Sequence, residues 1–500
     1  MKLEYLLKGL TMWELSGKRD IEVKGVTNDS RGVKEGYLFV AVKGSSQDGH
    51  GYLAKAIERG ANVLVVEHIE KEFKNTTIVR VPDTKVALDE LAVRFYRCPA
   101  QGMNLIGITG TNGKTTTSYV LESILREAGI KVGVIGTINY RFNGNSFDAS
   151  LTTPDYMELM RIIREMKDAG VTDIIVEVSS HSLDQGRTRG IHWSRALFTN
   201  FSRDHLDYHA TMDEYFKAKS LLFTSLGEDQ KGNQAGAVIN IDDPKGKIIQ
   251  ERAKVPVVSY GLGYNCMVRA LDIESTIGGL RFRLATPSWE IPVASSLLGQ
   301  INVYNILGAA ATAYSVNIDE RAISEGIEKL AYVPGRLQRV KNTRGLSVFV
   351  DYAHSPDALE KVLQTLRPFV KGRLITVFGC GGERDRGKRP EMGKVAGRYS
   401  DLVLITSDNP RRENPTEIVY EIEPGVREAG LKRVNSGSSS TGKGYDIIID
   451  RREAIKRAIH GATKEDIVLI AGKGHETYQL FRNRKRYFND IEEAASAASS

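Results

Sequence analysis

A glycine-rich stretch at residues 107–117 has the residue types of a phosphate-binding loop and follows a short apolar segment. Its sequence is GITGTNGKTTT. Glycines let the backbone turn so that N–H groups point at phosphate oxygens, at the positive end of the helix that follows. We expect Lys114 to reach the β- and γ-phosphates and Thr115 to place its hydroxyl on Mg²⁺. The alternative is a tight strand-to-helix turn that contains a lysine by chance. The strand–turn–helix context favours the phosphate loop and therefore use of a nucleoside triphosphate.

This loop differs at one position from the common phosphate-binding pattern G-x-x-x-x-G-K-[ST]. Where the pattern requires its leading glycine, this sequence has Ile108, and the glycines are Gly107, Gly110 and Gly113. The loop thus indicates a variant class of nucleotide-using protein. The reaction has to be deduced from other residues.

Three further polar residues downstream of the loop could take part in phosphate chemistry. Glu177 ends an apolar segment, His205 lies in a polar stretch, and Lys219 lies on a predicted amphipathic helix. A carboxylate at the carboxyl end of a parallel strand, beside a phosphate loop, is well placed to hold Mg²⁺. Taken singly, each has a simpler explanation: a solvated strand end, a structural histidine and a surface lysine. Their roles depend on whether the fold brings them together.

The elements that would position these residues alternate between strand and helix. Apolar segments at 103–109, 131–137 and 172–178 are separated by helical patterns at 115–129 and 155–170. This alternation is typical of a parallel sheet with helices on both faces. We therefore predict an α/β fold.

Five hundred residues exceed the size of one hydrophobic core, so we expect several domains. The segment RCPAQG and the dipeptide Pro334-Gly335 punctuate the chain. The predicted domains are residues 1–98, 99–333 and 334–500. The stretch NSGSSSTGKG at 435–444 is expected to be a flexible surface loop, and the tail EEAASAASS at 492–500 to be disordered at its end.

Composition excludes several classes of protein. The net charge of +7 suits an anionic partner, but no long basic run or aromatic RNA-binding signature is present, so small anionic substrates are favoured over nucleic acid. Cys98, Cys266 and Cys380 are too far apart for a zinc spacing or a disulfide framework. No apolar run approaches the roughly 20 residues that cross a bilayer, and the N-terminus does not read as a signal peptide. We expect a cytoplasmic protein without membrane insertion.

The form TGTNGKTT at residues 109–116 resembles the phosphate loop of the Mur ligases, the ATP-dependent amide-forming enzymes of peptidoglycan synthesis. In that family the loop also lacks the leading glycine. The resemblance extends over essentially the whole chain. It implies a three-domain architecture with a central P-loop parallel-sheet domain and a C-terminal Rossmann-like α/β domain. It also implies that ATP phosphorylates a carboxylate and that an amine then attacks the acyl phosphate.

The resemblance implies roles for the catalytic, metal and ATP residues. Lys114, Lys219, His205 and Glu177 would be catalytic. Tyr215, Ala218 and Lys219 match a Y-x-x-A-K motif whose lysine reacts with CO₂ to a carbamate, N6-carboxylysine, that helps hold a second Mg²⁺. Thr115, Glu177, His205 and the carbamate would hold the metal. The C-terminal domain would close over ATP. Contacts to ATP are implied for Gly110, Thr111, Asn112, Gly113, Lys114, Thr115, Thr116, Asn302, Asn305, Arg336 and Asp351, with His354 close to the last of these.

A uridine-nucleotide muramoyl-peptide, UDP-N-acetylmuramoyl-L-alanyl-D-glutamate, is the implied acid substrate. Short hydroxyls and an arginine suit a pyrophosphate and a peptide carboxylate. The N-terminal stretch GVTNDSRGVKEGYLFVAVKGSSQDGHGY resembles the uridine-binding domain of two family members. Thr153 before Pro154 could equally cap a helix, and DSRGVKEG could be a polar turn. The candidate residues are Ser30, Ser45, Thr152, Thr153, Ser179, Gln185 and Arg187.

The implied amine substrate is meso-diaminopimelate, because SDNPRREN has the form that diaminopimelate-adding members carry. Diaminopimelate has one carboxylate more than lysine, and an arginine fork can bind it bidentately. A site built for that carboxylate rejects an analogue that lacks it. Asn-Pro is also a common turn dipeptide, so a turn without a ligand is the alternative. The candidate residues are Arg384, Asp408, Asn409, Pro410, Arg411, Gly472 and Glu476.

Other functions are possible for a sequence with this phosphate loop. The nearest alternative is the same ligase with L-lysine as its amine. Folylpolyglutamate synthetase has a similar loop but is disfavoured by the N-terminal domain and the Asp408–Arg411 motif. A P-loop ATPase acting on a macromolecular partner would leave Lys219 and the third domain unexplained. A non-catalytic nucleotide-binding module is disfavoured because Lys114, Glu177 and His205 are all present.

Overall fold

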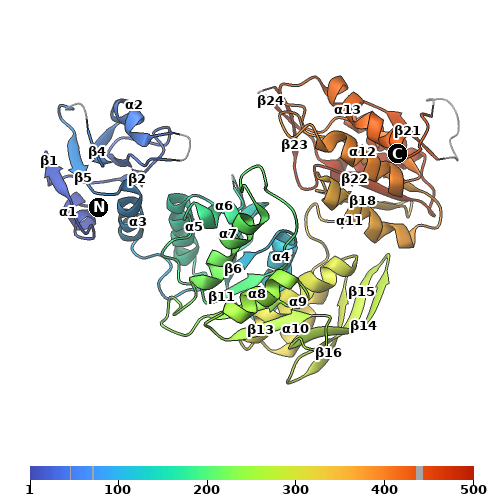
Figure 1. Cartoon of the computed structure of the whole chain (residues 1–500), viewed down its shortest axis with the longest axis horizontal. Helices are drawn as coiled ribbons and strands as arrows, with labels where there is room; N and C mark the ends of the chain where they lie inside the picture. Colours follow the sequence, from blue (N-terminus) through green and yellow to red (C-terminus); the bar gives the residue numbers. More distant parts are fainter. Residues whose placement is uncertain (45–46, 70–72, 150, 435–442, 483, 500) are drawn as a thin grey trace. The chain divides into compact units, whose positions relative to one another are not determined.

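The computed structural model describes residues 1–500 except 45–46, 70–72, 150, 435–442, 483 and 500 (Figure 1). The chain divides into two compact units: Met1–Arg269 with Leu307–Ile323, and Ala270–Ile306 with Ser324–Ser500. The domain boundaries predicted from the sequence remain a prediction. Ser45 lies outside the described residues, as does most of the predicted loop at 435–444.

The N-terminal part of the first unit is a small five-stranded sheet with its helices. The strand order is β1-β5-β4-β3-β2, parallel except for β1 against β5. Buried valines and leucines of β3 and β4 form its core. The strands are β1 (Glu14–Ser16), β2 (Gly25–Thr27), β3 (Tyr37–Val40), β4 (Ala61–Val66) and β5 (Thr77–Arg80). The helices are α1 (Leu3–Leu7), η1 (Gly49–Tyr52), α2 (Leu53–Glu58) and α3 (Thr84–Phe95).

The rest of the first unit is built on a parallel sheet that confirms the predicted strand–helix alternation. The order of its strands is β13-β12-β11-β6-β10-β7-β8-β9, with β8 and β9 antiparallel additions at one edge; β13 also pairs with the first two residues of β14, most of which belongs to the second unit. They are β6 (Asn104–Thr109), β7 (Val132–Ile135), β8 (Asn139–Phe142), β9 (Asn145–Asp148), β10 (Asp173–Glu177), β11 (Arg195–Phe198), β12 (Gly236–Asn240), β13 (Val257–Gly261) and β14 (Val268–Thr276). The helices are α4 (Lys114–Glu127), α5 (Tyr156–Asp168), α6 (Ser180–Asp184), α7 (Met212–Thr224) and α8 (Pro244–Arg252).

Strand β6 lies between β10 and β11, parallel to both. The carboxyl ends of parallel strands meet at one edge of a sheet, which is where ligands bind in open α/β folds. The phosphate loop leaves β6 at that edge, Glu177 ends β10 there, and the segment after β11 begins there. The topology therefore brings three stretches that are far apart in sequence to one place.

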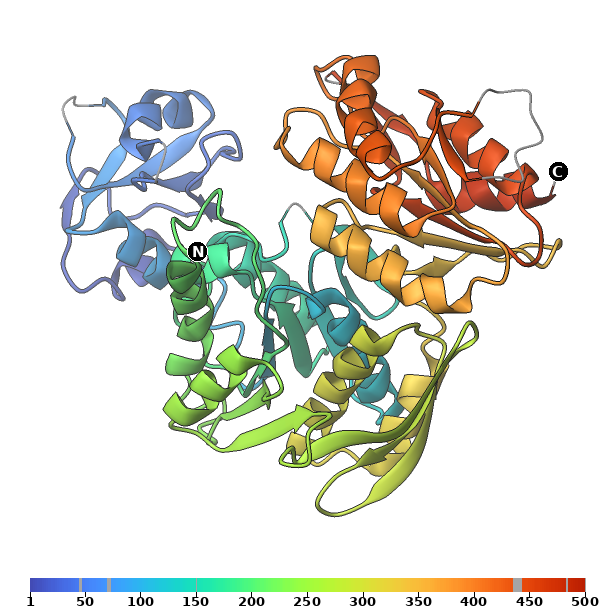
Figure 2. The same ribbon diagram turned by 45° about the vertical axis from the view of Figure 1, so that its right-hand side comes forward.

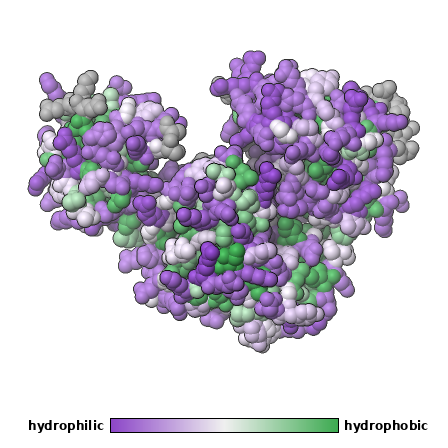
Figure 3. Space-filling model, viewed as in Figure 1, coloured by the Kyte–Doolittle hydropathy of each residue, from purple (hydrophilic) through white to green (hydrophobic). Residues whose placement is uncertain are grey.

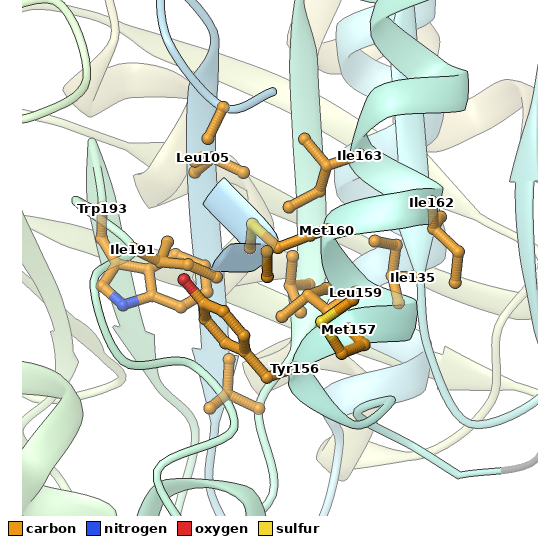
Figure 4. Packing of buried hydrophobic residues seen from close by; sticks show 14 of the residues in the cluster. Leu105, Ile135, Tyr156, Met157, Leu159, Met160, Ile162, Ile163, Ile191 and Trp193 are labelled. Atoms are coloured by element: carbon orange, nitrogen blue, oxygen red, sulfur yellow. The ribbon is translucent and has the colours of Figure 1, made fainter. Parts of the chain in front are cut away.

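Helix α5 shows how the core fixes this arrangement. Asp155 caps the helix by accepting a hydrogen bond from the Glu158 N–H, and the apolar positions that follow recur at helical spacing. Met160 and Ile163 lie on the side of α5 toward Leu105 of β6 (Figure 4). Burial of these side chains stabilises the packing of α5 on the sheet that carries the phosphate loop.

The second unit contains a six-stranded sheet with helices on both faces. The order is β17-β18-β22-β19-β20-β21, parallel except for β17. Separate buried clusters cover the two faces, as expected for a Rossmann-like sheet. The strands are β17 (Gln338–Arg339), β18 (Ser347–Asp351), β19 (Leu374–Phe378), β20 (Leu402–Ile405), β21 (Gly444–Ile447) and β22 (Ile467–Ala471), with the separate hairpin β23 (Tyr478–Phe481) and β24 (Arg484–Tyr487).

Helices α12 and α13 run side by side on one face of this sheet (Figures 1 and 2). A Cβ atom on Gly425 would lie only 1.8 Å from the carbonyl oxygen of Pro390, so glycine permits the close packing. The helices of the unit are α11 (Pro356–Leu366), η2 (Arg367–Phe369), α12 (Lys388–Tyr399), α13 (Pro415–Glu428), α14 (Arg451–His460) and α15 (Asp490–Ser499).

Two features differ from the sequence-based expectation. The tail is helical as far as Ser499 rather than disordered at its end, because alanines of α15 are buried and Asp490 forms a fully buried ion pair with Arg451 at 2.7 Å. The segment around residue 280 contains strands that were not predicted: β14 is followed by the antiparallel pair β15 (Gly279–Ala285) and β16 (Glu290–Ser295). Helices α9 (Gln300–Ser315) and α10 (Glu320–Lys329) then follow.

The face of the molecule in Figure 3 is mostly hydrophilic, with apolar side chains scattered over it. Across the described part of the chain, no helix has the length and apolar character needed to cross a membrane.

Candidate active site

The phosphate loop has the backbone geometry that its glycines predict. Gly110 and Gly113 have φ values of 147° and 89°, and Gly113 directly precedes α4. A Cβ on Gly110 would lie 1.9 Å from Thr199 Oγ1, so no larger residue fits there. Asn200, which the sequence analysis missed, holds the loop: its Oδ1 accepts from the Asn112 N–H at 3.0 Å. The loop is thus fixed by its own glycines and by the segment after β11.

Two lysines converge on one carbonyl of this loop. Lys114 Nζ donates to the carbonyl oxygens of Gly110 at 2.8 Å and Thr111 at 2.9 Å. Lys219 Nζ, from α7, donates to the same Gly110 oxygen at 2.9 Å. The structure therefore brings the two predicted catalytic lysines together at the end of β6.

Lys219 is not the surface lysine of a solvated helix face, since its side chain is 1% exposed. Burial lowers its pKa well below the ordinary value for lysine, and the nearby Lys114 lowers the pKa further. Its Nζ lies 4.6 Å from the centroid of the Tyr215 ring. A lowered pKa makes the amine easier to deprotonate, and the neutral amine is the form that reacts with CO₂.

Glu177 is buried and accepts hydrogen bonds from three hydroxyl groups, two on α4 and one after β7. Its Oε2 accepts from Thr115 Oγ1 at 2.8 Å and from Thr137 Oγ1 at 2.7 Å, and its Oε1 accepts from Ser118 Oγ at 3.3 Å. Glu177 itself is 1% exposed. The carboxylate and the Thr115 hydroxyl thus lie together at the N-terminus of α4, where a phosphate-bound cation is expected.

A set of aromatic rings lies beside the lysines. His205 has a positive φ of 54°, and its ring is 5.7 Å from Tyr215 and 4.9 Å from His181. Burial lowers the pKa of His205, and burial together with His205 and His209 lowers the pKa of His181 to about 4. Both imidazoles are therefore neutral at pH 7 and have a lone pair available for a ligand. His181 was not predicted from the sequence, although it follows Glu177 by only four residues.

The residues predicted to bind a metal would suit a magnesium ion that is held mainly by substrate. Among the described residues, no three His, Cys, Asp or Glu side chains converge as a protein-only metal site. Magnesium characteristically keeps several waters and takes one or two protein carboxylates together with phosphate oxygens. The pairing of Thr115 with Glu177 supplies such oxygen donors. Two lysines alone would add only positive charge, so conversion of Lys219 to an anion improves the fit.

Four of the predicted nucleotide-substrate residues form one network. Thr153 Oγ1 donates to the Glu177 carbonyl oxygen at 2.9 Å and accepts from the Ser179 N–H at 3.0 Å. Arg187 donates to the Thr153 carbonyl oxygen at 3.0 Å and to Gln185 Oε1 at 2.8 Å. Thr152 lies beside this network, 3.2 Å from Thr137 Oγ1. Ser30 is buried in the small N-terminal sheet region.

In the second unit, the predicted ATP-contacting residues Arg336 and Asp351 are close neighbours of Tyr352. The Arg336 guanidinium lies 5.1 Å from the centroid of the Tyr352 ring. Asp351 accepts from the N–H groups of Leu337 and Ala353, each at 2.7 Å. Burial raises the pKa of Asp351, against the influence of Arg336. The carboxylate therefore holds two loop backbones in place as well as facing the arginine.

The predicted adenine-side asparagines Asn302 and Asn305 are both on α9. Asn302 Nδ2 donates to the Leu298 carbonyl oxygen at 2.7 Å, and Asn305 Nδ2 donates to Asn302 Oδ1 at 2.8 Å. Both side chains are buried. Their hydrogen bonds order the N-terminal turn of α9.

The Asp408–Arg411 motif forms a tight turn whose arginine has a defined place. Arg411 has a φ of 52°, and its Nη1 donates to the Gly382 carbonyl oxygen at 2.7 Å. Asn409 Nδ2 donates to Glu476 Oε2 at 2.7 Å, so the turn is joined to the segment after β22. Arg384 is exposed, near Gly381. The structure therefore joins the two halves of the predicted amino-acid site, which are far apart in the sequence.

Three loops of this unit pack backbone against backbone. A Cβ on Gly335 would lie 2.3 Å from the His475 nitrogen, and a Cβ on Gly474 would lie 2.6 Å from Tyr352 Cβ. The Tyr352 N–H donates to the Gly335 carbonyl oxygen at 2.8 Å. The loops that carry Arg336, Asp351 and Glu476 are therefore interlocked.

Comparisons with known proteins match three regions in order. The family model "Mur ligase family, catalytic domain" matches residues 22–96, "Mur ligase middle domain" residues 108–313, and "Mur ligase, glutamate ligase domain" residues 335–474.

Relatives and solved structures extend this match over the full length. A UDP-N-acetylmuramoyl-L-alanyl-D-glutamate–2,6-diaminopimelate ligase from Geobacter metallireducens is 46% identical, covering 99% of this chain and 98% of that protein. One from Geobacillus thermodenitrificans is 42% identical, covering 99% of each. A solved structure of a ligase with the same name is 32% identical, with a TM-score of 0.69, covering 100% of this chain and 99% of that one.

A more distant structure shares the fold alone. MurF ligase from Thermotoga maritima in complex with ADP is 18% identical, with a TM-score of 0.60, covering 95% of this chain and 97% of that one. The first model covers the small N-terminal sheet, the second covers Lys114 and the buried Lys219, and the third covers the Asp408–Arg411 turn. Since full-length relatives also reach 46% identity, this chain belongs to the Mur ligase family.

Proposed function

We propose that this protein joins meso-diaminopimelate to UDP-N-acetylmuramoyl-L-alanyl-D-glutamate in an ATP-dependent reaction of peptidoglycan synthesis. ATP transfers its γ-phosphoryl group to a free carboxylate of the nucleotide dipeptide. An amino group of diaminopimelate attacks the resulting acyl phosphate, and inorganic phosphate leaves as the amide forms. The observation that carries this proposal is the full-length similarity, at up to 46% identity, to ligases named for these substrates.

The phosphate loop supports the first step. Lys114 now donates to two carbonyl oxygens of its own loop, so it is held within reach of phosphates that bind there. Its charge, with the N–H groups at the start of α4, stabilises the γ-phosphoryl group during transfer. Mg²⁺, which Thr115 and Glu177 would hold, neutralises phosphate charge when bound. The neutral His205 suits a further ligand position.

Lys219 supports a carbamate in the same place. Burial lowers the pKa of its amine, which lies beside Lys114, so a carbamate there would pair with a cation. The nitrogen attacks the carbon of CO₂ and loses a proton, which leaves N6-carboxylysine with one negative charge. This group would replace an electrostatic repulsion between two lysines with an attraction.

The acid substrate is assigned to the network around Thr153. Arg187, with its partners Gln185 and Thr153, offers guanidinium N–H groups on a preorganised support. Thr152 and Ser179 add hydroxyls, and Ser30 and Ser45 are assigned to the uridine nucleotide. Each of these roles is a proposal from the chemistry of the side chains.

The amine substrate is assigned to the turn at Asp408–Arg411 and the segment Gly472–Glu476. Arg411 and the exposed Arg384 suit the distal carboxylate, and the Glu476 carboxylate suits the distal amino group. The chemistry takes place with water excluded, since an acyl phosphate hydrolyses readily. We assign the enzyme to the cytoplasm, where ATP is available.

A phosphate-release assay tests the proposal. The purified protein, ATP, Mg²⁺ and the nucleotide dipeptide are incubated with meso-diaminopimelate, L-lysine or no amine. We expect phosphate and amide in equal amounts with meso-diaminopimelate, and little turnover otherwise. Preference for lysine would establish the alternative ligase. ATP hydrolysis independent of both co-substrates would point instead to an ATPase acting on another partner.

A further inference from the structure

Lys473 is a fully buried lysine to which the proposed reaction assigns no role. Its side chain is 0% exposed, and Nζ donates to Glu476 Oε2 at 3.0 Å and to the Tyr478 carbonyl oxygen. Its Nζ also lies 5.5 Å from the centroid of the Tyr478 ring. A buried ammonium group is costly unless it is paired and hydrogen-bonded. Through Glu476, this buried lysine belongs to the candidate amine site.

The hydrogen bonds around Lys473 engage only one of the two carboxylate oxygens of Glu476. Oε2 accepts from both Lys473 Nζ at 3.0 Å and Asn409 Nδ2 at 2.7 Å. Oε1 accepts no hydrogen bond from the residues that the structure describes, and the side chain is 20% exposed. With two donors on one oxygen, the carboxylate has a fixed rotation and presents its second oxygen to a ligand.

The same network reaches the arginine of the Asp408–Arg411 turn. Asn409 Oδ1 accepts from the Leu480 N–H at 2.8 Å, and the Arg411 N–H donates to the Leu480 carbonyl oxygen, also at 2.8 Å. Leu480 thus holds both ends of the turn. Through Asn409 and Leu480, the place of Glu476 is fixed relative to that of Arg411.

We infer that Lys473 is a positioning residue that fixes the spacing between Glu476 and Arg411 and so selects the stereoisomer of the diamino acid. This inference rests on the proposed function. The distal carbon of diaminopimelate carries one amino group and one carboxylate. In the LL isomer these two groups are exchanged relative to the meso isomer. A carboxylate and an arginine at a fixed spacing bind one arrangement well and leave the other with mismatched charges.

The test compares the two isomers in wild type and in Lys473→Met, which keeps the side-chain length and removes the charge. We expect wild type to prefer the meso isomer in kcat/KM. In the variant the meso-to-LL ratio should fall at least about tenfold, which corresponds to about 1.4 kcal/mol. The loss should lie mainly in KM for meso-diaminopimelate, with KM for the nucleotide dipeptide unchanged.

Lys485→Met is the matched control. Lys485 is exposed, and its Nζ lies 4.4 Å from the centroid of the same Tyr478 ring, but it makes no hydrogen bond to Glu476. This variant should keep the wild-type ratio. Lys473→Gln, which retains a donor, should give an intermediate ratio and provides the decisive measurement if Lys473→Met is unfolded by circular dichroism.

The outcomes separate the inference from the function on which it rests. A folded Lys473→Met or Lys473→Gln protein with the wild-type ratio would overturn the positioning role. An active wild type that uses both isomers equally would also overturn it. A wild type that forms no amide with either isomer would instead refute the proposed function.

Discussion

Replacing Arg411 by alanine should reduce the use of diaminopimelate far more than the use of lysine. The Arg411 backbone is held independently of its side chain, because its N–H donates to the Leu480 carbonyl oxygen at 2.8 Å. The substitution removes the side chain beyond Cβ, including the guanidinium and its contact to the Gly382 carbonyl oxygen. The turn should therefore keep its shape while the proposed partner of the distal carboxylate disappears.

The magnitude follows from the charge left without a partner. Truncating one member of a desolvated, hydrogen-bonded charge pair costs on the order of 2–5 kcal/mol. The kcat/KM for meso-diaminopimelate should then fall at least roughly 30-fold, since about 1.4 kcal/mol corresponds to a factor of ten. Lysine has no distal carboxylate, so its kcat/KM should change much less. The KM for the nucleotide dipeptide should stay near the wild-type value.

The assay is amide formation with each amino acid, and the next residue supplies the control. Arg412 is 73% exposed and lies 3.8 Å from Glu383, and an exposed ion pair of this kind contributes at most about 1 kcal/mol. Arg412→Ala should behave as wild type with both amines. Equal losses for the two amines in Arg411→Ala would mean that Arg411 only shapes the turn. A wild type that prefers lysine would refute the assignment of the substrate.

Three other predictions follow from the first unit. Lys114→Ala should abolish phosphate release while the circular dichroism melting curve stays close to wild type; full activity would contradict a phosphate-binding role. Lys219→Ala should be nearly inactive, with partial recovery when small carboxylic acids are added, and mass spectrometry of the active enzyme should find the carbamate. Burial raises the pKa of Asp89 to about 6, against the influence of Arg189. Because the folded protein holds this proton more tightly than the unfolded chain, Asp89 adds to the free energy of unfolding below pH 3.8, its ordinary pKa. That contribution is lost as the pH rises through about 6. Asp89→Asn should therefore raise Tm at pH 8 relative to wild type and lose that advantage at about pH 4.

The central parallel sheet could be predicted because strand and helix segments there have strong and different periodicities. The strand order that places β6 between β10 and β11 could not be predicted, since it depends on packing between segments far apart in the sequence. The antiparallel strands β15 and β16 were missed although Leu280–Leu284 alternates apolar and charged residues, which is the pattern of a half-buried strand. The helical tail was missed because its alanines acquire their significance only when they pack on α14.

The candidate site was predictable where a residue lies within a motif. Residues that act through contacts across the fold gave no such signal. Asn200 holds the phosphate loop from another strand end, and His181 joins the histidine cluster from α6. In the sequence Lys473 cannot be told from a surface lysine, and only the fold reveals its complete burial. The assigned roles of the motif residues remain predictions that the experiments above can test.

The interlocked glycines of the second unit limit how this enzyme can evolve a new amine preference. Gly335 and Gly474 meet neighbouring loops at distances that exclude even a methyl group. A substitution in one loop would therefore need simultaneous changes in the others, which single-step mutation rarely supplies. Variation should accumulate instead at solvent-facing positions around the turn, such as Arg384 and Arg412. Libraries intended to diversify the accepted amino acid should sample those positions and leave the three interlocked loops unchanged.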